Sequence, residues 1–295
     1  MFDLLGIPPQ ALFGQLLIGL INGSFYALLS LGLAVIFGML NIINFAHGAL
    51  YMLGAFVAWF LLQYFGLSYW WALIVAPVVV GLVGLVIERT MLRWLYKLDH
   101  LYGLLLTFGL ALIIQGVFRN EFGSSGLPYQ IPDALQGAQN LGFMVLPTYR
   151  AWVVIVSLIL CIATWYAIER TKLGAYLRAA TENPSLVQAF GVNVPRLITL
   201  TYAFGVALAA FAGVLAAPIY RVSPLMGADL IIVVFAVVVI GGMGSILGST
   251  ITGFALGVVE GLTKVFYPEA SNTVIFVIMA IVLFIKPAGL FGRAA

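Results

Sequence analysis

ERTKLGAYLRAATENPSLVQAFGVNVPR, residues 169–196, is a polar island in a chain that is otherwise almost entirely apolar. Long apolar runs precede and follow it, so the island is predicted to be a solvated loop with short helices of its own. A loop of this length on one face of a membrane protein is more often a docking surface than a simple connector. The island therefore indicates where a partner binds, and the apolar sequence around it indicates the fold class.

The composition of the whole chain excludes a water-soluble domain. Of its 295 residues, 63% are hydrophobic and 8% are charged, and the mean hydropathy is +1.15. Soluble proteins carry about 25% charged residues. A spanning segment must satisfy its backbone hydrogen bonds internally, which glycine-rich apolar runs do as helices. The predicted fold class is therefore all-α, a polytopic helical membrane protein. Its net charge of +3 requires no nucleic-acid partner.

Nine apolar runs predict eight or nine transmembrane helices, because about 20 residues cross a bilayer core. The runs cover approximately residues 11–38, 42–65, 69–88, 101–118, 150–168, 197–217, 229–243, 246–265 and 272–286. Broken or re-entrant segments are predicted near residues 39–48 and 241–249. No linker or shift in composition marks a second domain, so residues 1–295 are predicted to form a single membrane domain.

Lysine and arginine collect on the cytoplasmic side of membrane proteins, and this bias orients the chain. Two crossings separate the loops that begin near residues 89 and 169, so both loops face the same side. The basic residues expected on the cytoplasmic side are Arg89, Arg93, Lys97, Arg170, Lys172, Arg178, Arg196, Lys286 and Arg293. Those expected outside are Arg119, Arg150, Arg221 and Lys264. The loop 169–196 is therefore predicted to be cytoplasmic.

The loop 119–149 is predicted to be external, and its glycines and prolines are typical of an ordered surface loop rather than a helix. Such a loop either receives a soluble partner or caps the helix ends.

A polar stripe in the first third of the chain is the first candidate site. Asn41, Asn44 and His47 recur every three residues and share one face of a helix or tight turn. Such a stripe is costly in a bilayer unless it meets water, a partner helix or a substrate. The candidate pathway residues of this region are Asn22, Ser24, Asn41, Asn44, His47 and Gly48. The alternative is hydrogen bonding between helices, which contributes about 0.6 to 2 kcal/mol in membranes.

A second glycine-rich break, GGMGSILGS at residues 241–249, adds Gly241, Gly242, Gly244 and Ser245 to the candidate pathway. Glycine there permits φ > 0, close helix approach and free backbone groups that face a cavity. The segment is not predicted to bind nucleotide, because no Lys-Ser or Lys-Thr pair follows the glycines.

Two sets of small residues, each spaced by four, predict close helix packing. They are Gly205, Ala209 and Gly213, and Gly253, Gly257 and Gly261. Asp229 and Glu260 are ionisable residues near or within apolar runs and are functional candidates. Asp229 could instead cap a helix, and an ordinary pair with Lys264 would explain Glu260.

No metal site and no catalytic function are predicted. No Cys, Asp or Glu stands at ligand spacing from His47. No motif for nucleophilic or metal-dependent catalysis is present either, so the chain is not predicted to be an enzyme.

Within the island, residues 174–180 and 185–190 are predicted to be short helices, interrupted by Asn183 and Pro184 and closed by Gly191. Apolar residues, with Leu177 and Val187 among them, are predicted to project as knobs that fit a groove on a soluble partner. The candidate coupling residues are Leu173, Tyr176, Arg178, Glu182, Leu186, Phe190 and Gly191.

Three segments in order carry a resemblance to a known family. They are GLINGSFYALLSLGLAVIFGMLNIINFAHGAL near the N-terminus, RTKLGAYLRAATENPSLVQAFGVNVPRL in the island, and the late DLIIVVFAVVVIGGMGSILGSTITG. The chain resembles the LivH-type permeases of branched-chain amino-acid ABC transporters over nearly its whole length. The resemblance implies a multi-pass permease of the bacterial inner membrane.

The resemblance also implies partners and site residues. The partners would be a related second permease, two cytoplasmic ATPase subunits that use ATP and Mg, a periplasmic binding protein and membrane lipid, with no cofactor in this chain. Residues 173–194 would be the coupling loop, with Gly191 at the position of a loop glycine, and residues 41–48 and 241–248 would lie near the pore. One departure is that Ser185, Leu186 and Val187 replace the Glu-Ala-Ala often found six residues before that glycine.

The expected function is that of a translocation subunit of an ATP-driven importer for branched-chain or related small amino acids. Relatives that carry urea, short amides or other small organic solutes are the alternative within the class. An ion-coupled secondary transporter, or a membrane scaffold or channel, is the alternative from another class. A proton-coupled carrier usually needs a deep carboxylate, and the sequence shows no convincing one.

Overall fold

The computed structural model describes residues 8–40, 42–96 and 98–292, so the predictions for Asn41, Lys97 and Arg293 lie outside the described residues. In the described part, seven helices are long and apolar enough to cross a membrane by length and composition. They are α1 (Pro9–Leu40), α2 (Ala46–Phe65), α3 (Tyr69–Ile87), α5 (His100–Phe122), α6 (Thr148–Glu169), α9 (Val194–Tyr220) and α11 (Ile246–Phe266). Two apolar helices are shorter, α10 (Ala228–Gly241) and α12 (Val274–Ile285). Each predicted apolar run therefore corresponds to a helix, and the all-α membrane fold is confirmed.

The remaining short elements lie in the loops that connect these helices. A π-helix, η1 (Glu88–Leu92), and α4 (Arg93–Leu95) follow α3. The loop between α5 and α6 contains η2 (Asp133–Leu135) and an antiparallel pair of short strands, β1 (Ala138–Asn140) and β2 (Val145–Pro147). The polar island forms α7 (Lys172–Glu182) and α8 (Pro184–Ala189), and η3 (Pro268–Ala270) precedes α12. The island helices are as predicted; the π-helix and the hairpin were not predicted.

The loops on both faces are shorter than predicted, because the helices continue past the apolar runs. Arg119 lies within α5, which ends only where Gly123 adopts φ +70°. The connection to α6 therefore begins at Gly123, and the connection between α6 and α9 begins after Glu169 and ends before Val194.

Helix α1 is the centre of the bundle and packs along its length against α11. A Cβ atom on Gly257 would lie 2.3 Å from the Cα of Gly23 and 2.4 Å from the carbonyl oxygen of Gly19. A Cβ on Gly253 would lie 2.5 Å from the Cα of Ala27. Close packing of this kind drives helix association in lipid, where burial of apolar surface supplies little. The predicted ridge of small residues on α11 is therefore a helix contact.

The second predicted ridge, on α9, also packs against neighbouring backbone. A Cβ on Gly205 would lie 2.8 Å from the carbonyl oxygen of Gly32 in α1, and one on Gly213 would lie 2.0 Å from that of Tyr51 in α2. Because only glycine allows such approaches, α9 lies between α1 and α2 and fixes their separation.

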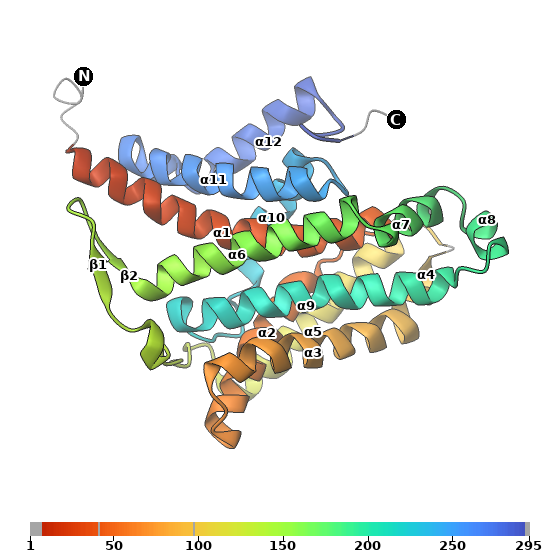
Figure 1. Cartoon of the computed structure of the whole chain (residues 1–295), viewed down its shortest axis with the longest axis horizontal. Helices are drawn as coiled ribbons and strands as arrows, with labels where there is room; N and C mark the ends of the chain where they lie inside the picture. Colours follow the sequence, from red (N-terminus) through yellow and green to blue (C-terminus); the bar gives the residue numbers. More distant parts are fainter. Residues whose placement is uncertain (1–7, 41, 97, 293–295) are drawn as a thin grey trace.

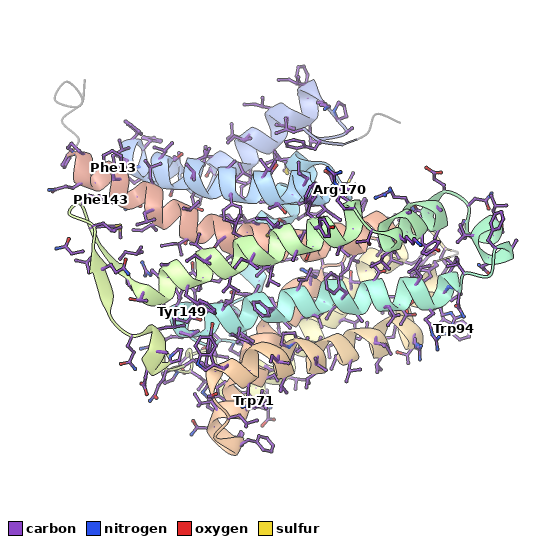
Figure 2. All side chains as sticks on the ribbon, viewed as in Figure 1. Phe13, Trp71, Trp94, Phe143, Tyr149 and Arg170 are labelled. Carbon is purple, nitrogen blue, oxygen red and sulfur yellow. The ribbon has the colours of Figure 1, made fainter. Side chains whose placement is uncertain are left out.

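The two ends of the bundle differ in the loops they carry. Helices α4, α7 and α8 lie at one end, and the hairpin of β1 and β2 lies at the other (Figure 1). Trp94 and Arg170 mark the first end, and Phe13, Phe143 and Tyr149 the second (Figure 2). Arg89 and Arg93 therefore share an end with the island, as their predicted location requires. This end, which the positive-inside bias predicts to be cytoplasmic, is called the island end below, and the opposite end is called the hairpin end.

Candidate translocation and coupling site

The first predicted break is an irregular segment, residues 42–45, between α1 and α2. The side chain of Thr107 in α5 holds its backbone: the Oγ1 atom accepts from the Phe45 amide at 3.2 Å and lies 3.2 Å from the carbonyl oxygen of Ile43. Non-helical backbone at membrane depth is tolerated only where protein or water satisfies its polar groups. Thr107 therefore allows the chain to be non-helical at this point.

The polar side chains of the break bind neighbouring helices. The Asn44 amide donates to the Tyr202 hydroxyl in α9 at 3.1 Å, and His47 Nε2 lies 3.1 Å from the carbonyl oxygen of Leu29 in α1. Both side chains are buried, at 1% and 0% exposure. In this conformation the two side chains connect helices by hydrogen bonds, which is the alternative to a role in the substrate pathway. Asn44 Oδ1 and His47 Nδ1 have no hydrogen-bond partner among residues 8–40, 42–96 and 98–292.

The two upstream candidates differ in their environment. Ser24 is fully buried and donates to the carbonyl oxygen of Ile21, one turn earlier in its own helix, at 2.7 Å. Asn22 is partly exposed and accepts a hydrogen bond from the Tyr220 hydroxyl at the end of α9, at 3.0 Å. Of this pair, Asn22 is the one that can meet solvent, near the hairpin end.

A third interruption, residues 221–227, was not predicted from the sequence. It follows α9 at the hairpin end, where Leu127 and Val222 form an isolated bridge, and it leads to the start of α10. A Cβ on Gly48 would lie 2.5 Å from the carbonyl oxygen of Gly227, so α2 and α10 begin side by side within the bundle. Pro224, Gly227 and the short length of the following apolar run were the available signals.

The second predicted break, residues 242–245, is a tight turn between α10 and α11. Gly242 and Gly244 have φ values of +104° and +82°, which the glycine pattern anticipated. Ser245 caps α11 by accepting from the Gly248 amide at 3.1 Å. A Cβ on Gly241 would lie 2.7 Å from the carbonyl carbon of Gly248, so the turn brings the two helices into contact.

A cavity of about 460 Å³ at the island end lies between the predicted coupling loop and the second predicted break. Its lining includes Gly38 of α1, Arg178 and Thr181 of α7, and Gly244 and Ser245 of the turn. The structure therefore places one coupling candidate beside two pathway candidates. The break at residues 42–45 does not line this cavity.

Helix α7 is anchored to the membrane helices by its apolar side. A Cβ on Gly174 would overlap the carbonyl oxygen of Ile168, and Leu177 is buried. Arg178 forms an ion pair with Glu169 at 3.4 Å. Val187 of α8 is buried as well, so the prediction that Leu177 and Val187 project as knobs is wrong. Each lies on the inner face of an amphipathic helix, which docks the island against the bundle.

The outer face of the island carries the remaining candidates. Leu173, Tyr176, Leu186 and Phe190 are exposed by 47%, 46%, 53% and 79%. Glu182 is exposed at the end of α7. Gly191 has φ +85° and its amide donates to the carbonyl oxygen of Gln188, as expected of a residue that closes a helix. The loop thus exposes apolar side chains on an ordered support.

A buried carboxylate that sequence reasoning missed connects this loop to the break. Glu88, 1% exposed in the π-helix, accepts from the Tyr96 hydroxyl at 2.7 Å and from the Thr199 hydroxyl at 2.6 Å. Thr199 stands in α9 near its start after the island, and Tyr202, which binds Asn44, follows one turn later. Helix α9 therefore links the island, Glu88 and the break.

Replacing Glu88 with alanine should destabilise the folded protein by about 1 to 3 kcal/mol, because the Tyr96 hydroxyl would lose its acceptor. The Thr199 hydroxyl would keep the carbonyl oxygen of Pro195, at 3.0 Å, as an acceptor. Thermal unfolding of the purified protein in detergent checks this expectation. Glu121→Ala, at an exposed position near the end of α5, is the control and should change little. Equal melting temperatures for the two variants would show that the Glu88 contacts contribute nothing.

These features define a class: a polytopic helical membrane protein whose helices are interrupted within the bundle and whose polar loop at the island end is ordered. Comparison with known proteins then identifies the family. The model of the family described as "Branched-chain amino acid transport system / permease component" matches residues 15–283. The chain belongs to this family of permease components.

Relatives match over nearly the whole chain. The high-affinity branched-chain amino acid transport system permease protein LivH of Escherichia coli K12 is 31% identical over 95% of each chain. BraD of Pseudomonas aeruginosa, named as a permease protein of the same kind of system, shows the same identity and coverage. LivM of E. coli K12, a second permease protein of that system, is 28% identical over 90% of this chain and 67% of its own length. No solved structure matches the chain.

Proposed function

We propose that this chain is the translocating subunit of an ATP-driven importer for branched-chain or related small amino acids, in the inner membrane of a bacterium. The observation that carries the proposal is the island, an ordered cytoplasmic loop with an exposed apolar face. Its inner face borders the cavity beside residues 244 and 245. Similarity to LivH and BraD supports the choice of amino acids as substrates.

The island is proposed to receive force from two cytoplasmic ATPase subunits, which would bind ATP and Mg themselves. Their exposed contacts on this chain would be Leu173, Tyr176, Leu186 and Phe190. Because α7 packs against the end of α6 and α9 starts directly after the island, a push on the loop would move both helices as rigid bodies. Movement of α9 would act on Asn44 through Tyr202 and so on the break.

A related second permease is proposed to complete the pathway. LivH and LivM are both named as permease proteins of one transport system in E. coli K12, and this chain is similar to both. A periplasmic binding protein is proposed to dock at the opposite end, where the hairpin of β1 and β2 and the external loop lie (Figure 1). The binding protein would hold the ligand tightly, so the permease would need little affinity of its own.

Reconstituted transport tests the proposal. Proteoliposomes that contain this chain, the second permease and both ATPases should take up leucine only when ATP is present on the ATPase side and the binding protein on the other. The chain alone should take up none under a proton or sodium gradient. Gradient-driven uptake by the chain alone would instead establish an ion-coupled secondary transporter.

The substrate class needs its own measurement, because the family alternative includes urea, short amides and other small organic solutes. Thermal shifts of the binding protein across a panel of amino acids and amides should be largest for leucine, isoleucine or valine. A thermal shift seen only with urea or an amide would change the proposed substrate class and leave the ATP-driven mechanism in place.

A further inference from the structure

Asp229 differs from the other carboxylates inside the bundle. Glu88 is buried and accepts two hydroxyl hydrogen bonds. Glu260 is buried too; it accepts from the Tyr26 hydroxyl at 2.7 Å and pairs with Lys264 at 2.5 Å. Asp229 is exposed, and within residues 8–40, 42–96 and 98–292 its side chain makes no hydrogen bond or ion pair. No described residue neutralises its charge.

The position of Asp229 places this unpaired carboxylate at membrane depth. Helix α10 has 14 residues and is about 21 Å long, whereas a bilayer core is about 30 Å thick. Its last residue, Gly241, packs against Gly248, and Gly244 of the adjoining turn packs against Gly38 near the cytoplasmic end of α1. The first turn of α10, which holds Asp229, therefore stops about 9 Å short of the external surface.

A second contact gives the same depth independently. Gly227, just before α10, touches Gly48, which directly follows His47. His47 in turn bonds the carbonyl oxygen of Leu29, about 16 Å along α1 from its cytoplasmic end at Leu40. An aspartate side chain is too short to reach interfacial water from this depth, as a long lysine can.

An ionised carboxylate exposed at this depth cannot face lipid without a large cost. The side of α10 that carries Asp229 is otherwise apolar: Ile232, three residues on, is 54% exposed, and Val233, four residues on, is partly exposed. Ile231 and Phe235, two and six residues on, lie on the opposite side of the helix. Phe235 stacks on Phe45 of the break, with ring centroids 6.2 Å apart. One negative charge thus stands beside aliphatic side chains, which complements a ligand that carries one ammonium group and an aliphatic side chain.

We propose that Asp229 binds the ammonium group of the amino acid in the translocation pathway, and that the Ile232 face of α10 is a wall of that pathway. The inference rests on the proposed import of amino acids and assigns the residue that recognises their charged amine.

Cysteine labelling tests the inference without relying on transport. Cys161 is the single cysteine of the chain and is buried, so Cys161→Ala gives a clean background. In the assembled transporter, Ile232→Cys should react with water-soluble methanethiosulfonates, and the cationic reagent should react about tenfold faster than the anionic one. Asp229→Asn should abolish that preference. Ile159→Cys, at a 59% exposed position on α6, is the lipid-facing control and should stay unreactive.

Transport by charge variants completes the test. Asp229→Asn should lower leucine uptake about tenfold, as loss of one charged contact implies, and Asp229→Glu should keep most of it.

Failure of Ile232→Cys to react, an unchanged reagent preference in Asp229→Asn, or normal uptake by that variant would each overturn the assignment. Loss of the second permease from purified Asp229→Asn would also overturn it, because the partner of the carboxylate would then be a subunit cation. ATP-driven uptake by the wild type in any of these cases would leave the proposed function standing.

Discussion

Gly257→Val is expected to leave little folded protein. A Cβ at this position would lie 2.3 Å from the Cα of Gly23 and 2.4 Å from the carbonyl oxygen of Gly19, and both are backbone atoms that no rotamer change can move. Overpacking of a core usually costs about 1 to 3 kcal/mol, when side chains can adjust. Here α1 and α11 would have to separate, and α1 is also the helix that contacts α9. We therefore expect a loss at or above the upper end of that range.

The yield of monodisperse protein on size-exclusion chromatography and its thermal unfolding in detergent measure this effect. Gly109→Val is the matched control, because Gly109 lies in α5 and a Cβ there would have no atom within 4 Å. That variant should behave like the wild type. If Gly257→Val kept the wild-type yield and melting temperature, the close contact of α1 and α11 would not be what holds the bundle together.

Gly191→Val is expected to uncouple ATP hydrolysis from uptake while the protein still folds. Gly191 has φ +85°, and a Cβ there would meet no atom within 4 Å, so any effect comes from the backbone alone. A left-handed conformation costs about 1 to 2 kcal/mol for ordinary residues, and a β-branched side chain opposes it further. The loop would shift at the point where it closes α8 and leads into α9.

The number of leucine molecules imported per ATP hydrolysed, in the reconstituted transporter, checks this prediction. Gly191→Asn is the matched variant, because asparagine enters the left-handed region more readily and also fits the open space. It should keep coupled transport, whereas Gly191→Val should hydrolyse ATP with little uptake. Normal ligand-stimulated uptake by Gly191→Val would count against the coupling role of the island.

Much of the fold could be predicted because a membrane imposes strong rules on a sequence. A long apolar run has to be a helix, since no water satisfies its backbone, so the nine runs match nine helices in the described residues. Glycines at helix ends and in turns also carry local information: Gly191, Gly242 and Gly244 all have positive φ. The small-residue ridges of α9 and α11 were recognisable from their spacing alone.

The site was less predictable, because its residues are far apart in the chain. Glu88 and Thr199 are separated by 111 positions, and nothing in either segment indicates the other. Asn44 was chosen for its polarity, but its burial against Tyr202 depends on where α9 packs. Leu177 and Val187 looked like exposed knobs, because a short amphipathic helix does not reveal which partner its apolar side contacts. The assignment of individual side chains to pathway or packing required neighbours from other helices.

The amino-acid sequence by itself determined the membrane class, the order and approximate ends of the helices, the polar loop between α6 and α9 and the family, since each depends on local composition or on a contiguous motif. Only the tertiary structure decided that α2 and α10 begin side by side at membrane depth, that α9 links the island to the break, and that Asp229 is exposed with no partner among the described residues. These are properties of helix packing. Packing depends on contacts between distant residues, which no local pattern encodes.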